Sequence, residues 1–372
     1  MLYLDNSATT AILPQVKDKM VTYLSEEFGN PSGKYYELAE NAKIAVKEAR
    51  THVANLIQSK EHEVIFTSGA TESNNIVIKG VADYYSDKGK HIITTKTEHN
   101  AVLDVCEFLK TKGFEVTYLD VDHYGRINPS DLKDSIRQDT ILVSIMWGNN
   151  EIGSLNDIKR ISEICLERDV FFHTDATQVL GKLNIDLQFL DGVTFLSCSA
   201  HKMHGPKGVG ALFIRSDEYG KLTPLTPLFH GGGQEEGIRS GTYSVHNIAG
   251  FGEAARIAKE NFERNIYALE QLEAKLLQLL NEKFGNRIAY NSDSENKIPG
   301  IVNVRFKGLN NEILLKKLSP IIAASSGSAC SSTKPSHVLQ EIGLNIDEVR
   351  ESVRFSFSPY TSVEDVDIFK EL

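Results

Sequence analysis

Short runs of apolar, largely β-branched residues recur in the first part of the chain, between about residues 63 and 214. The runs are "EVIFTS", "HIITTK", "EVTYLD", "ILVSIMW", "VFFHTD", "VTFLSC" and "VGALFI". Segments with helical periodicity separate several of them, including residues 74–85 and 156–168. Strands that are buried on both faces and alternate with helices are typical of an α/β layer with a mainly parallel sheet. We therefore predict such a layer for this part of the chain.

The rest of the chain has a different pattern. A helical pattern from about Ala254 to Lys283 repeats apolar residues at intervals of three, four and seven, and it predicts one helix that joins two domains. The later runs "RIAYNS", "IVNVRF" and "VRFSFS" mix with helices and predict a smaller α+β domain. A chain of 372 residues also exceeds what one hydrophobic core usually organises. We expect a large domain over residues 15–255 and a small domain from residues 1–14 plus 256–372.

Composition and charge narrow the classes of function. The formal net charge of −10 argues against direct binding to nucleic acid, which needs a basic face. No apolar run approaches membrane-spanning length, and the opening "MLYLDNSATT" lacks the pattern of a secretory signal. The four cysteines are scattered, without a CxxC pair or a metal-binding spacing. We expect a cytoplasmic protein with reduced thiols and no membrane partner.

Polar clusters directly follow five of the predicted strands. They are "GATESNN", "TEHNAV", "GNNEIG", "DATQ" and "SAHKMHGPKG". In an open α/β sheet the ligand crevice lies beyond the carboxyl ends of the strands. We therefore expect the five clusters to converge on one site.

Two of these clusters are suited to binding an anion. Residues 69–71 precede a helical pattern, where backbone N–H groups and a hydroxyl can hold a phosphate. The simpler alternative is a helix cap by Ser68 or Thr71. Ser199 and His201 lie just before the lysine of their cluster and offer further donors. The alternative there is a glycine-rich surface turn, which the wholly apolar strand before it disfavours.

Other phosphate sites and metal sites fit the sequence less well. The glycines at 205, 208 and 210 match neither the P-loop nor the dinucleotide-binding fingerprint. His201 and His204 are three positions apart, with no third ligand in suitable company, so we predict no metal site. Pyridoxal phosphate fits the sequence better, because the strand ends carry a lysine, an aspartate, an imidazole and a candidate phosphate cradle. This cofactor is attached covalently to a lysine and needs an acidic partner for its ring nitrogen.

Cys330 lies in "AASSGSACSS", among residues that are too small and too polar to form a core. The other cysteines, Cys106, Cys165 and Cys198, fall in apolar patterns and read as small buried hydrophobic residues. On this pattern alone, Cys330 is either an incidental exposed cysteine or a reactive thiol on a mobile loop.

Taken together, the motifs resemble the cysteine desulfurases of the NifS/IscS class, which are fold-type-I pyridoxal phosphate enzymes of the class V aminotransferase type. The similarity covers essentially the whole chain, in the family's order: "YLDNSATT", "SGATESNN", "TEHNAV", "NNEIG", "HTDATQ", "SAHKMHGPKGVG", "GGGQEEGIRSGT", "SSGSACSS", "PSHVL" and "VRFSFS". The resemblance implies a mainly parallel seven-stranded sheet, a smaller α+β C-terminal domain and a homodimer with shared active sites. It also implies removal of sulfur from L-cysteine to give L-alanine and a persulfide on Cys330, which a sulfur-acceptor protein then receives.

The same resemblance assigns roles by matching position. Lys202 would form the Schiff base with pyridoxal phosphate, and Asp175 would pair with the ring nitrogen. Gln178 would hydrogen-bond the ring's phenolic oxygen. His99 would stack on the ring and is a candidate proton carrier.

Further roles implied by the resemblance concern the thiol, the phosphate and the substrate. Cys330 would be the nucleophile, on a mobile loop at about residues 323–335. Asn150 and Arg354 would bind the substrate carboxylate, and Asn150 would also contact the cofactor. Thr242 would reach the phosphate bound to the other subunit. The remaining phosphate ligands would be Ala70, Thr71, Ser199 and His201.

Some features depart from the family pattern, and some alternatives stay open. Ser7 stands where alanine is usual, and Tyr35 lies near a common histidine position, so no role is carried to it. The segment after Cys330 is about two residues shorter than the family's.

The alternatives are a selenocysteine lyase, an aminotransferase and a non-catalytic scaffold for sulfur transfer. The sulfur could serve iron–sulfur clusters, transfer RNA, cofactors or DNA modification.

Overall fold

The computed structural model describes residues 1–327 and 335–371 of the chain. Its α-helices are α1 (Pro14–Ser25), α2 (Glu37–Ile57), α3 (Ala70–Tyr84), α4 (Asn100–Lys110), α5 (Pro129–Ser135), α6 (Ile158–Glu167), α7 (Val245–Glu260), α8 (Phe262–Phe284), α9 (Asn311–Leu318), α10 (His337–Glu341) and α11 (Ile346–Arg350). Its strands are β1 (Leu2–Tyr3), β2 (Val64–Thr67), β3 (His91–Thr95), β4 (Glu115–Leu119), β5 (Thr140–Ser144), β6 (Phe171–Asp175), β7 (Val193–Ser199), β8 (Gly210–Ile214), β9 (Ile288–Tyr290), β10 (Ile301–Phe306), β11 (Ile322–Ala323) and β12 (Ser352–Ser356). The short 3₁₀ helices are η1 (Glu61–Glu63), η2 (Ala200–Lys202), η3 (Glu235–Gly237), η4 (Gly285–Arg287) and η5 (Glu364–Lys370).

A seven-stranded sheet forms the centre of the larger part of the molecule, in the order β2-β8-β7-β6-β5-β3-β4. Each of the seven predicted apolar runs contributes one strand. Neighbours from β7 to β4 pair in parallel, while β8 pairs antiparallel with both β2 and β7. The prediction of a mainly parallel α/β sheet is confirmed.

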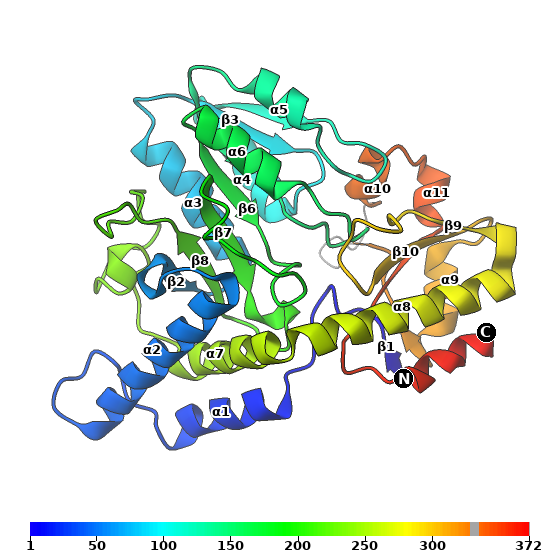
Figure 1. Cartoon of the computed structure of the whole chain (residues 1–372), viewed down its shortest axis with the longest axis horizontal. Coiled ribbons are helices and arrows are strands. Elements are labelled where there is room, and N and C mark those ends of the chain that lie inside the picture. The colour runs from blue at the N-terminus through cyan, green and yellow to red at the C-terminus, as the bar shows by residue number, and fades with distance from the viewer. Residues whose placement is uncertain (328–334, 372) are drawn as a thin grey trace.

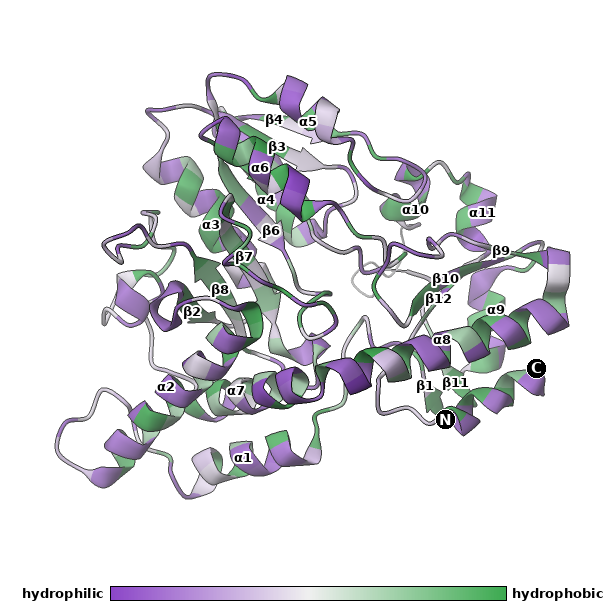
Figure 2. Ribbon diagram, in the orientation of Figure 1, coloured by the Kyte–Doolittle hydropathy of each residue, from purple (hydrophilic) through white to green (hydrophobic). Residues whose placement is uncertain are grey.

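Helices cover both faces of this sheet (Figure 1). Side chains of α3 and α4 share one hydrophobic core with strand residues such as Ile92 and Leu142. Side chains of α1, α2, α6 and α7 share the other core with the next strand residues, Ile93 and Val143. Every residue of β8 is buried, and Figure 2 shows this strand in green, the colour of hydrophobic residues. This explains why the strands read as continuous apolar runs.

The prediction of one connecting helix from Ala254 to Lys283 is wrong in detail. The structure has two helices, α7 and α8, which meet end to end at Asn261 (Figure 1). Asn261 has φ −107° and ψ 16°, and its side-chain amide donates to the carbonyl oxygen of Ile257 at 2.9 Å. Such a bond from an asparagine side chain competes with the regular helix ladder, so the helix breaks there.

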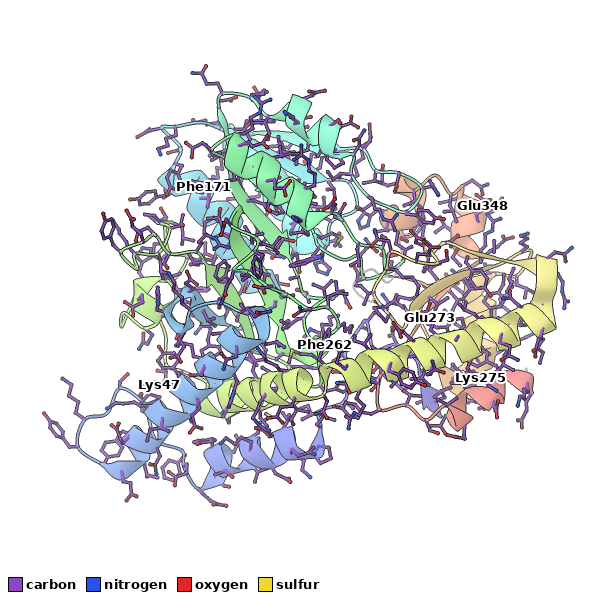
Figure 3. The ribbon with its side chains drawn as sticks, in the orientation of Figure 1. Lys47, Phe171, Phe262, Glu273, Lys275 and Glu348 are labelled. Carbon is purple, nitrogen blue, oxygen red and sulfur yellow. The ribbon has the colours of Figure 1, made fainter. Side chains whose placement is uncertain are left out.

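Helix α8 supports a smaller sheet, β12-β10-β9, which is antiparallel. Figure 3 labels Glu273 and Lys275 on this helix. Glu273 forms an ion pair with Lys297 at 2.6 Å and Lys275 forms one with Asp367 at 3.0 Å. These contacts fix α8 to the chain before β10 and to η5. The domain boundaries expected from the sequence stay a prediction.

A separate two-stranded sheet pairs β1 in parallel with β11. It brings the first residues of the chain next to the C-terminal part of the molecule. Within residues 1–327 and 335–371, no helix combines the length and the apolar character needed to span a bilayer.

Candidate active site

A cavity of about 1470 Å³, open to solvent, lies at the carboxyl ends of the central strands. It receives side chains from all five polar clusters that follow the predicted strands. The predicted site residues that line it are Ala70, Thr71, His99, Asn150, Asp175, Gln178, Ser199, His201, Lys202 and Arg354. The expected convergence of the clusters is therefore present in the structure.

The predicted phosphate cradle lies at the start of α3. Gly69 precedes the helix with φ +152°, a conformation that favours glycine, and a Cβ there would lie 3.6 Å from Ser199 Oγ. No side-chain hydrogen bond caps the helix, so its first N–H groups can serve an anion. Arg239 pairs with the nearby Glu72 at 2.7 Å and offsets the negative charge of that carboxylate.

Asp175 ends strand β6 and is buried, with 7% of its surface exposed. Asn74 Nδ2, on α3, donates to Asp175 Oδ2 at 2.8 Å. The Thr177 backbone N–H donates to Oδ1 at 3.0 Å. These two bonds fix the plane of the carboxylate at the base of the cavity.

His173 lies two residues before Asp175 and supports the strands beneath the cavity. Its ring nitrogens hydrogen-bond the hydroxyl groups of Ser144 on β5 and Ser197 on β7, at 2.8 and 2.9 Å. Complete burial lowers the pKa of His173 to about 4, although the nearby Asp175 carboxylate opposes this shift. The ring is therefore neutral at pH 7 and can act as a donor to one serine and an acceptor from the other.

Lys202 lies at the end of η2, just beyond β7. Its ammonium donates to the backbone carbonyl oxygen of Ser7 and, at 2.8 Å, to that of Ala8. Gln178 Nε2 donates to the same Ser7 oxygen at 2.9 Å. The N-terminal segment thus holds the lysine and the glutamine side by side in the cavity wall. His201, from the same turn, contacts Thr9 Oγ1 at 3.2 Å.

His99 begins helix α4 as its N-cap. The Ala101 backbone N–H donates to His99 Nδ1 at 3.0 Å. A ring nitrogen that accepts a hydrogen bond carries no proton, so the neutral ring has its proton on Nε2. The cap holds the imidazole in the wall of the cavity and leaves Nε2 as its donor.

Arg354 comes from β12, far along the chain from the other clusters, and only 1% of it is exposed. One terminal nitrogen donates to Asp5 Oδ1 at 2.6 Å, and the other donates to the backbone oxygen of Asn150 at 2.9 Å. Its Nε has no hydrogen-bond partner among the described residues. A guanidinium held in the wall of a cavity is suited to a carboxylate ligand, because its planar fork matches the two carboxylate oxygens.

Two predicted site residues are not among those that line the main cavity. Among the described residues, Thr242 lines an adjoining cavity instead of the main one; Ser68 and Gly208 border both. Cys330 lies outside the described residues, as does the middle of the loop predicted at 323–335.

The other three cysteines are free and buried, as predicted. Burial raises the pKa of Cys106, Cys165 and Cys198 to about 12. These thiols are protonated at neutral pH, so none of them is a suitable nucleophile.

The cavity suits pyridoxal phosphate by the chemistry of its donors and acceptors. It combines an amine, a fixed carboxylate, an imidazole and an uncapped helix start. Several buried polar atoms around it also have no partner among the described residues, including Ser7 Oγ, Asn74 Oδ1 and Thr177 Oγ1. Buried polar atoms are normally satisfied, so this set indicates a polar ligand. No group of three potential metal ligands occurs in the part of the chain that the structure describes.

Comparison with known proteins identifies the family. The model for class-V aminotransferases matches residues 2–369. The cysteine desulfurase IscS of Colwellia psychrerythraea is 46% identical over 375 residues, which cover 100% of this chain and 91% of the relative. The chain belongs to the class-V aminotransferase family, among the cysteine desulfurases. It is thus a pyridoxal-phosphate-dependent sulfurtransferase.

Further relatives and solved structures agree with membership of the cysteine desulfurase family. The cysteine desulfurase IscS of Neisseria meningitidis serogroup A is 45% identical over 373 residues, again covering 100% of this chain and 91% of the relative. A NifS-like protein superposes with a TM-score of 0.91 at 35% identity, covering 100% of this chain and 97% of the other. SspA in complex with cysteine gives a TM-score of 0.83 at 38% identity, with coverages of 97% and 100%. The predicted fold type and activity are confirmed.

Proposed function

We propose that the cavity around Lys202 is the site of desulfuration and that its residues act as the family resemblance implies. The observation that supports this most strongly is the meeting of Lys202, Asp175 and Arg354 in one cavity, although they come from three different strands or strand ends. The substrate is L-cysteine, in line with the solved structure described as SspA in complex with cysteine.

The cofactor would be held by residues at or just beyond the ends of strands in the larger sheet. Lys202 would attach it, Asp175 would hold a proton on its ring nitrogen, and Gln178 and His99 would contact the ring. Its phosphate would be held by Ala70, Thr71, Ser199 and His201. When bound, pyridoxal phosphate withdraws electrons from the substrate and so labilises bonds next to the amine-bearing carbon.

Arg354 and Asn150 bind the carboxylate of L-cysteine. Asp5 and the Asn150 backbone keep the guanidinium of Arg354 in place at the wall of the cavity. The Lys202 amine would take the proton from the substrate's α-carbon. His99 would act as a proton carrier through its Nε2–H, since its Nδ1 accepts from the Ala101 backbone N–H.

Cys330 takes the sulfur atom. Its thiolate attacks the substrate sulfur, a sulfur–sulfur bond forms, and the carbon–sulfur bond of the substrate breaks. The released three-carbon unit gains a proton and leaves as L-alanine. The persulfide on Cys330 then passes its outer sulfur to an acceptor protein, so no external oxidant or reductant enters this step.

The assembly and setting complete the proposal. We propose a homodimer in which Thr242 of one subunit serves the phosphate site of the other. The free, buried thiols of residues 106, 165 and 198 fit a reducing cytoplasm. The final acceptor could belong to iron–sulfur cluster assembly, transfer-RNA thiolation, cofactor synthesis or DNA modification.

Two variants test the assignments together. Cys330→Ser should bind pyridoxal phosphate normally, yet lose alanine formation by at least about 100-fold, because a hydroxyl cannot accept the sulfur. Lys202→Ala should lose the covalent attachment itself, which borohydride reduction followed by peptide mass spectrometry detects. Full alanine output from Cys330→Ser would reject the nucleophile, and cofactor reduced onto another lysine would reject the anchor.

A further inference from the structure

Residues 328–335, the cysteine segment, contain Cys330 and connect two residues that lie against each other. A Cβ on Gly327, just before the segment, would lie 3.5 Å from the Cβ of Ser336, just after it. These two ends are close in space although nine positions separate them in the sequence. The chain therefore enters and leaves the cysteine segment at nearly the same point.

The side chain of Glu151 lies against both ends of the cysteine segment. Ser336 Oγ donates to Glu151 Oε2 at 2.5 Å, and a Cβ on Gly327 would approach the same oxygen to 2.8 Å. Gly327 also has φ +143°, so its conformation and its closeness to the carboxyl group both favour glycine. Because Glu151 is completely buried, its carboxyl group meets these two ends inside the protein and not in solvent.

The backbone of Glu151 is itself fixed. Its N–H donates to Asn149 Oδ1 at 2.8 Å, and its carbonyl oxygen accepts from Asn303 Nδ2, on β10, at 3.2 Å. Glu151 also directly follows Asn150, which lines the main cavity. A carboxyl group on a turn fixed in this way can hold a neighbouring segment in place.

Both ends of the cysteine segment are bonded to residues at or next to the wall of the main cavity. Ser325 exchanges two backbone hydrogen bonds with Arg354, at 2.7 and 3.2 Å, and Arg354 lines the cavity. Beyond the other end, His337 Nε2–H donates to the carbonyl oxygen of Glu98 at 3.0 Å. Glu98 directly precedes His99, another residue of the cavity wall.

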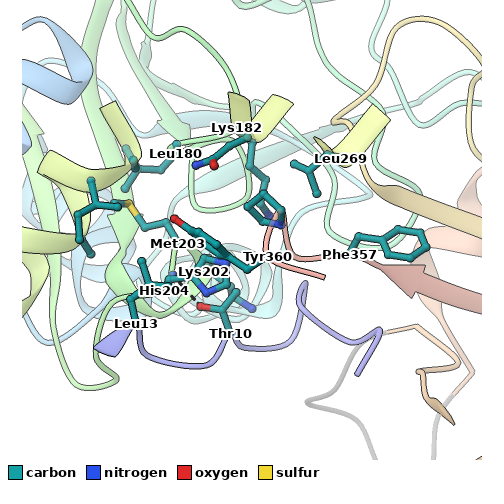
Figure 4. A pocket seen from close by; sticks show the side chains of 16 residues that line it. Thr10, Leu13, Leu180, Lys182, Lys202, Met203, His204, Leu269, Phe357 and Tyr360 are labelled. Carbon is teal, nitrogen blue, oxygen red and sulfur yellow. Dashed lines mark hydrogen bonds between the residues drawn. The ribbon is translucent and has the colours of Figure 1, made fainter. Parts of the chain in front are cut away.

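Lys202 also borders a second cavity, of about 450 Å³, and Figure 4 shows its wall. The described residues that line this cavity include none of His99, Asn150 and Arg354, and neither end of the cysteine segment. The segment is thus anchored beside the main cavity and not beside the second one.

The fixed ends limit how far from the main cavity Cys330 can lie. Cys330 is three positions after Gly327, and three fully extended residues span at most about 10–11 Å. Six positions separate it from Ser336, which allows about 20 Å, so the connection to Gly327 sets the limit. A thiol tethered in this way has a high effective concentration near the cavity.

We propose that Glu151 is a positioning residue that holds the two ends of the cysteine segment together beside the main cavity, so that the Cys330 thiol can meet the sulfur of bound L-cysteine. This inference rests on the proposed role of Cys330 as the sulfur acceptor. Without the carboxyl group, the Ser336 hydroxyl loses its acceptor and the two ends are no longer tied. Glu151 is not among the residues that line the main cavity, so binding of the cofactor and of L-cysteine should not depend on its side chain.

Separate measurements of sulfur transfer and of substrate binding test this role. In Glu151→Met, which removes both carboxyl oxygens, the single-turnover rate at which Cys330 gains a persulfide should fall by about 10–100-fold. Rapid quenching followed by peptide mass spectrometry measures that rate in the cofactor-loaded enzyme. The affinity for L-cysteine should stay native, measured by absorbance with Cys330→Ser added to prevent turnover. Glu151→Gln, which keeps an acceptor for Ser336, should recover most of the native rate.

Ser336→Ala breaks the same hydrogen bond from its other side. It should also slow persulfide formation, by about tenfold or more, and leave the affinity for L-cysteine unchanged. The double variant Glu151→Met with Ser336→Ala should be no slower than the slower single variant, whereas independent effects would multiply. Glu341→Met and Lys317→Met, at exposed positions on α10 and α9, are the controls and should leave both binding and transfer unchanged.

A native transfer rate in Glu151→Met, or losses that multiply in the double variant, would overturn the proposal. A parallel loss of L-cysteine affinity would also overturn it, because a merely structural defect weakens binding together with transfer. If Glu151→Met does not fold, which circular dichroism would reveal, a native transfer rate in Ser336→Ala would overturn the proposal by itself. Failure of the proposed function would be seen separately, as alanine formation that persists in Cys330→Ser.

Discussion

Glu98 is a carboxyl group enclosed by protein, directly before His99 in the chain. Only 1% of it is exposed; the Met146 backbone N–H and Thr95 Oγ1 donate to its Oε1 at 2.7 and 3.0 Å. Burial, with a smaller contribution from the Asp175 carboxylate, raises the pKa of Glu98 to about 8. At pH 7 the group is therefore neutral. It leaves Asp175 as the fixed negative charge for the ring nitrogen of the cofactor.

Replacing Glu98 with glutamine should change the pH dependence of stability. The group ionises near pH 4.5 when unfolded but near pH 8 when folded, so the native protein loses stability as the pH rises through this window. Glu98→Gln keeps the Oε1 acceptor and cannot ionise. Its unfolding free energy should match the native value near pH 4.5 and exceed it at pH 9 by on the order of a few kcal/mol.

Urea denaturation at the two pH values measures this difference. Exposed Glu218 provides the control, because Glu218→Gln should retain the native pH dependence. Identical pH profiles for Glu98→Gln and the native protein would show that Glu98 ionises normally in the folded state.

The candidate catalytic and cofactor-binding residues could be predicted from the sequence more readily than the residues that hydrogen-bond to them and hold them in place. Lys202 and Asp175 follow apolar strands, where a polar residue stands out. Asn74 holds Asp175 from 101 positions away, and Asp5 holds Arg354 from 349 positions away. No local pattern could pair them, because these contacts exist only once the sheet and the N-terminal segment are assembled.

At the scale of elements, the periodicity of apolar residues located the strands. It did not predict the break between α7 and α8 or the antiparallel direction of β8. The break between α7 and α8 depends on the Asn261 amide, which a periodic apolar pattern does not register. The direction of β8 follows from its short connection to β7, residues 200–209. A parallel crossover needs a dozen or more residues, so this strand must return antiparallel.

The first residue of β8, Gly210, lies against the phosphate cradle. A Cβ at this position would approach the Gly69 Cα to 2.7 Å and would also meet the Cys198 carbonyl oxygen. Gly210→Ala should therefore cost about 1–3 kcal/mol of stability and also weaken binding of pyridoxal phosphate, because the start of α3 must shift. Urea denaturation and absorbance titration with the cofactor measure the two effects.

Gly113→Ala separates backbone strain from displacement of the cradle. Gly113 has φ +85°, and the space that a Cβ would occupy there is open, so alanine should cost about 1 kcal/mol and leave cofactor affinity unchanged. If Gly210→Ala binds the cofactor as tightly as Gly113→Ala does, β8 does not shape the cradle.

At the scale of the whole molecule, the cavity draws on three parts of the chain: the ends of the central strands, the N-terminal segment and β12. Thr242, which the family resemblance assigns to a neighbouring subunit's phosphate, lines an adjoining cavity and is exposed. Because Ser68 and Gly208 border both cavities, its hydroxyl could serve either its own chain or a partner. The sequence offers no means of choosing, since a shared site depends on how two copies meet.

Hybrid dimers distinguish the two arrangements. One subunit carries Lys202→Ala and the other carries Thr242→Val, with different affinity tags so that only hybrids are purified. If Thr242 serves the partner, the Lys202-bearing site receives an intact threonine from the other subunit, and the hybrid should show about half of the native alanine-forming activity. If Thr242 serves its own chain, both sites are defective, and the hybrid should be no more active than half of the Thr242→Val homodimer.

A hybrid of Lys202→Ala with Lys317→Met sets the reference, because its second site is complete under either arrangement and should give the half-native rate. Restored activity in the threonine hybrid, up to that reference, means that the catalytic unit is the pair of subunits. In that case dilution that separates the subunits must abolish turnover even though every residue that lines the cavity remains on one chain. A threonine hybrid no more active than half of the Thr242→Val homodimer would instead show that Thr242 acts within its own chain.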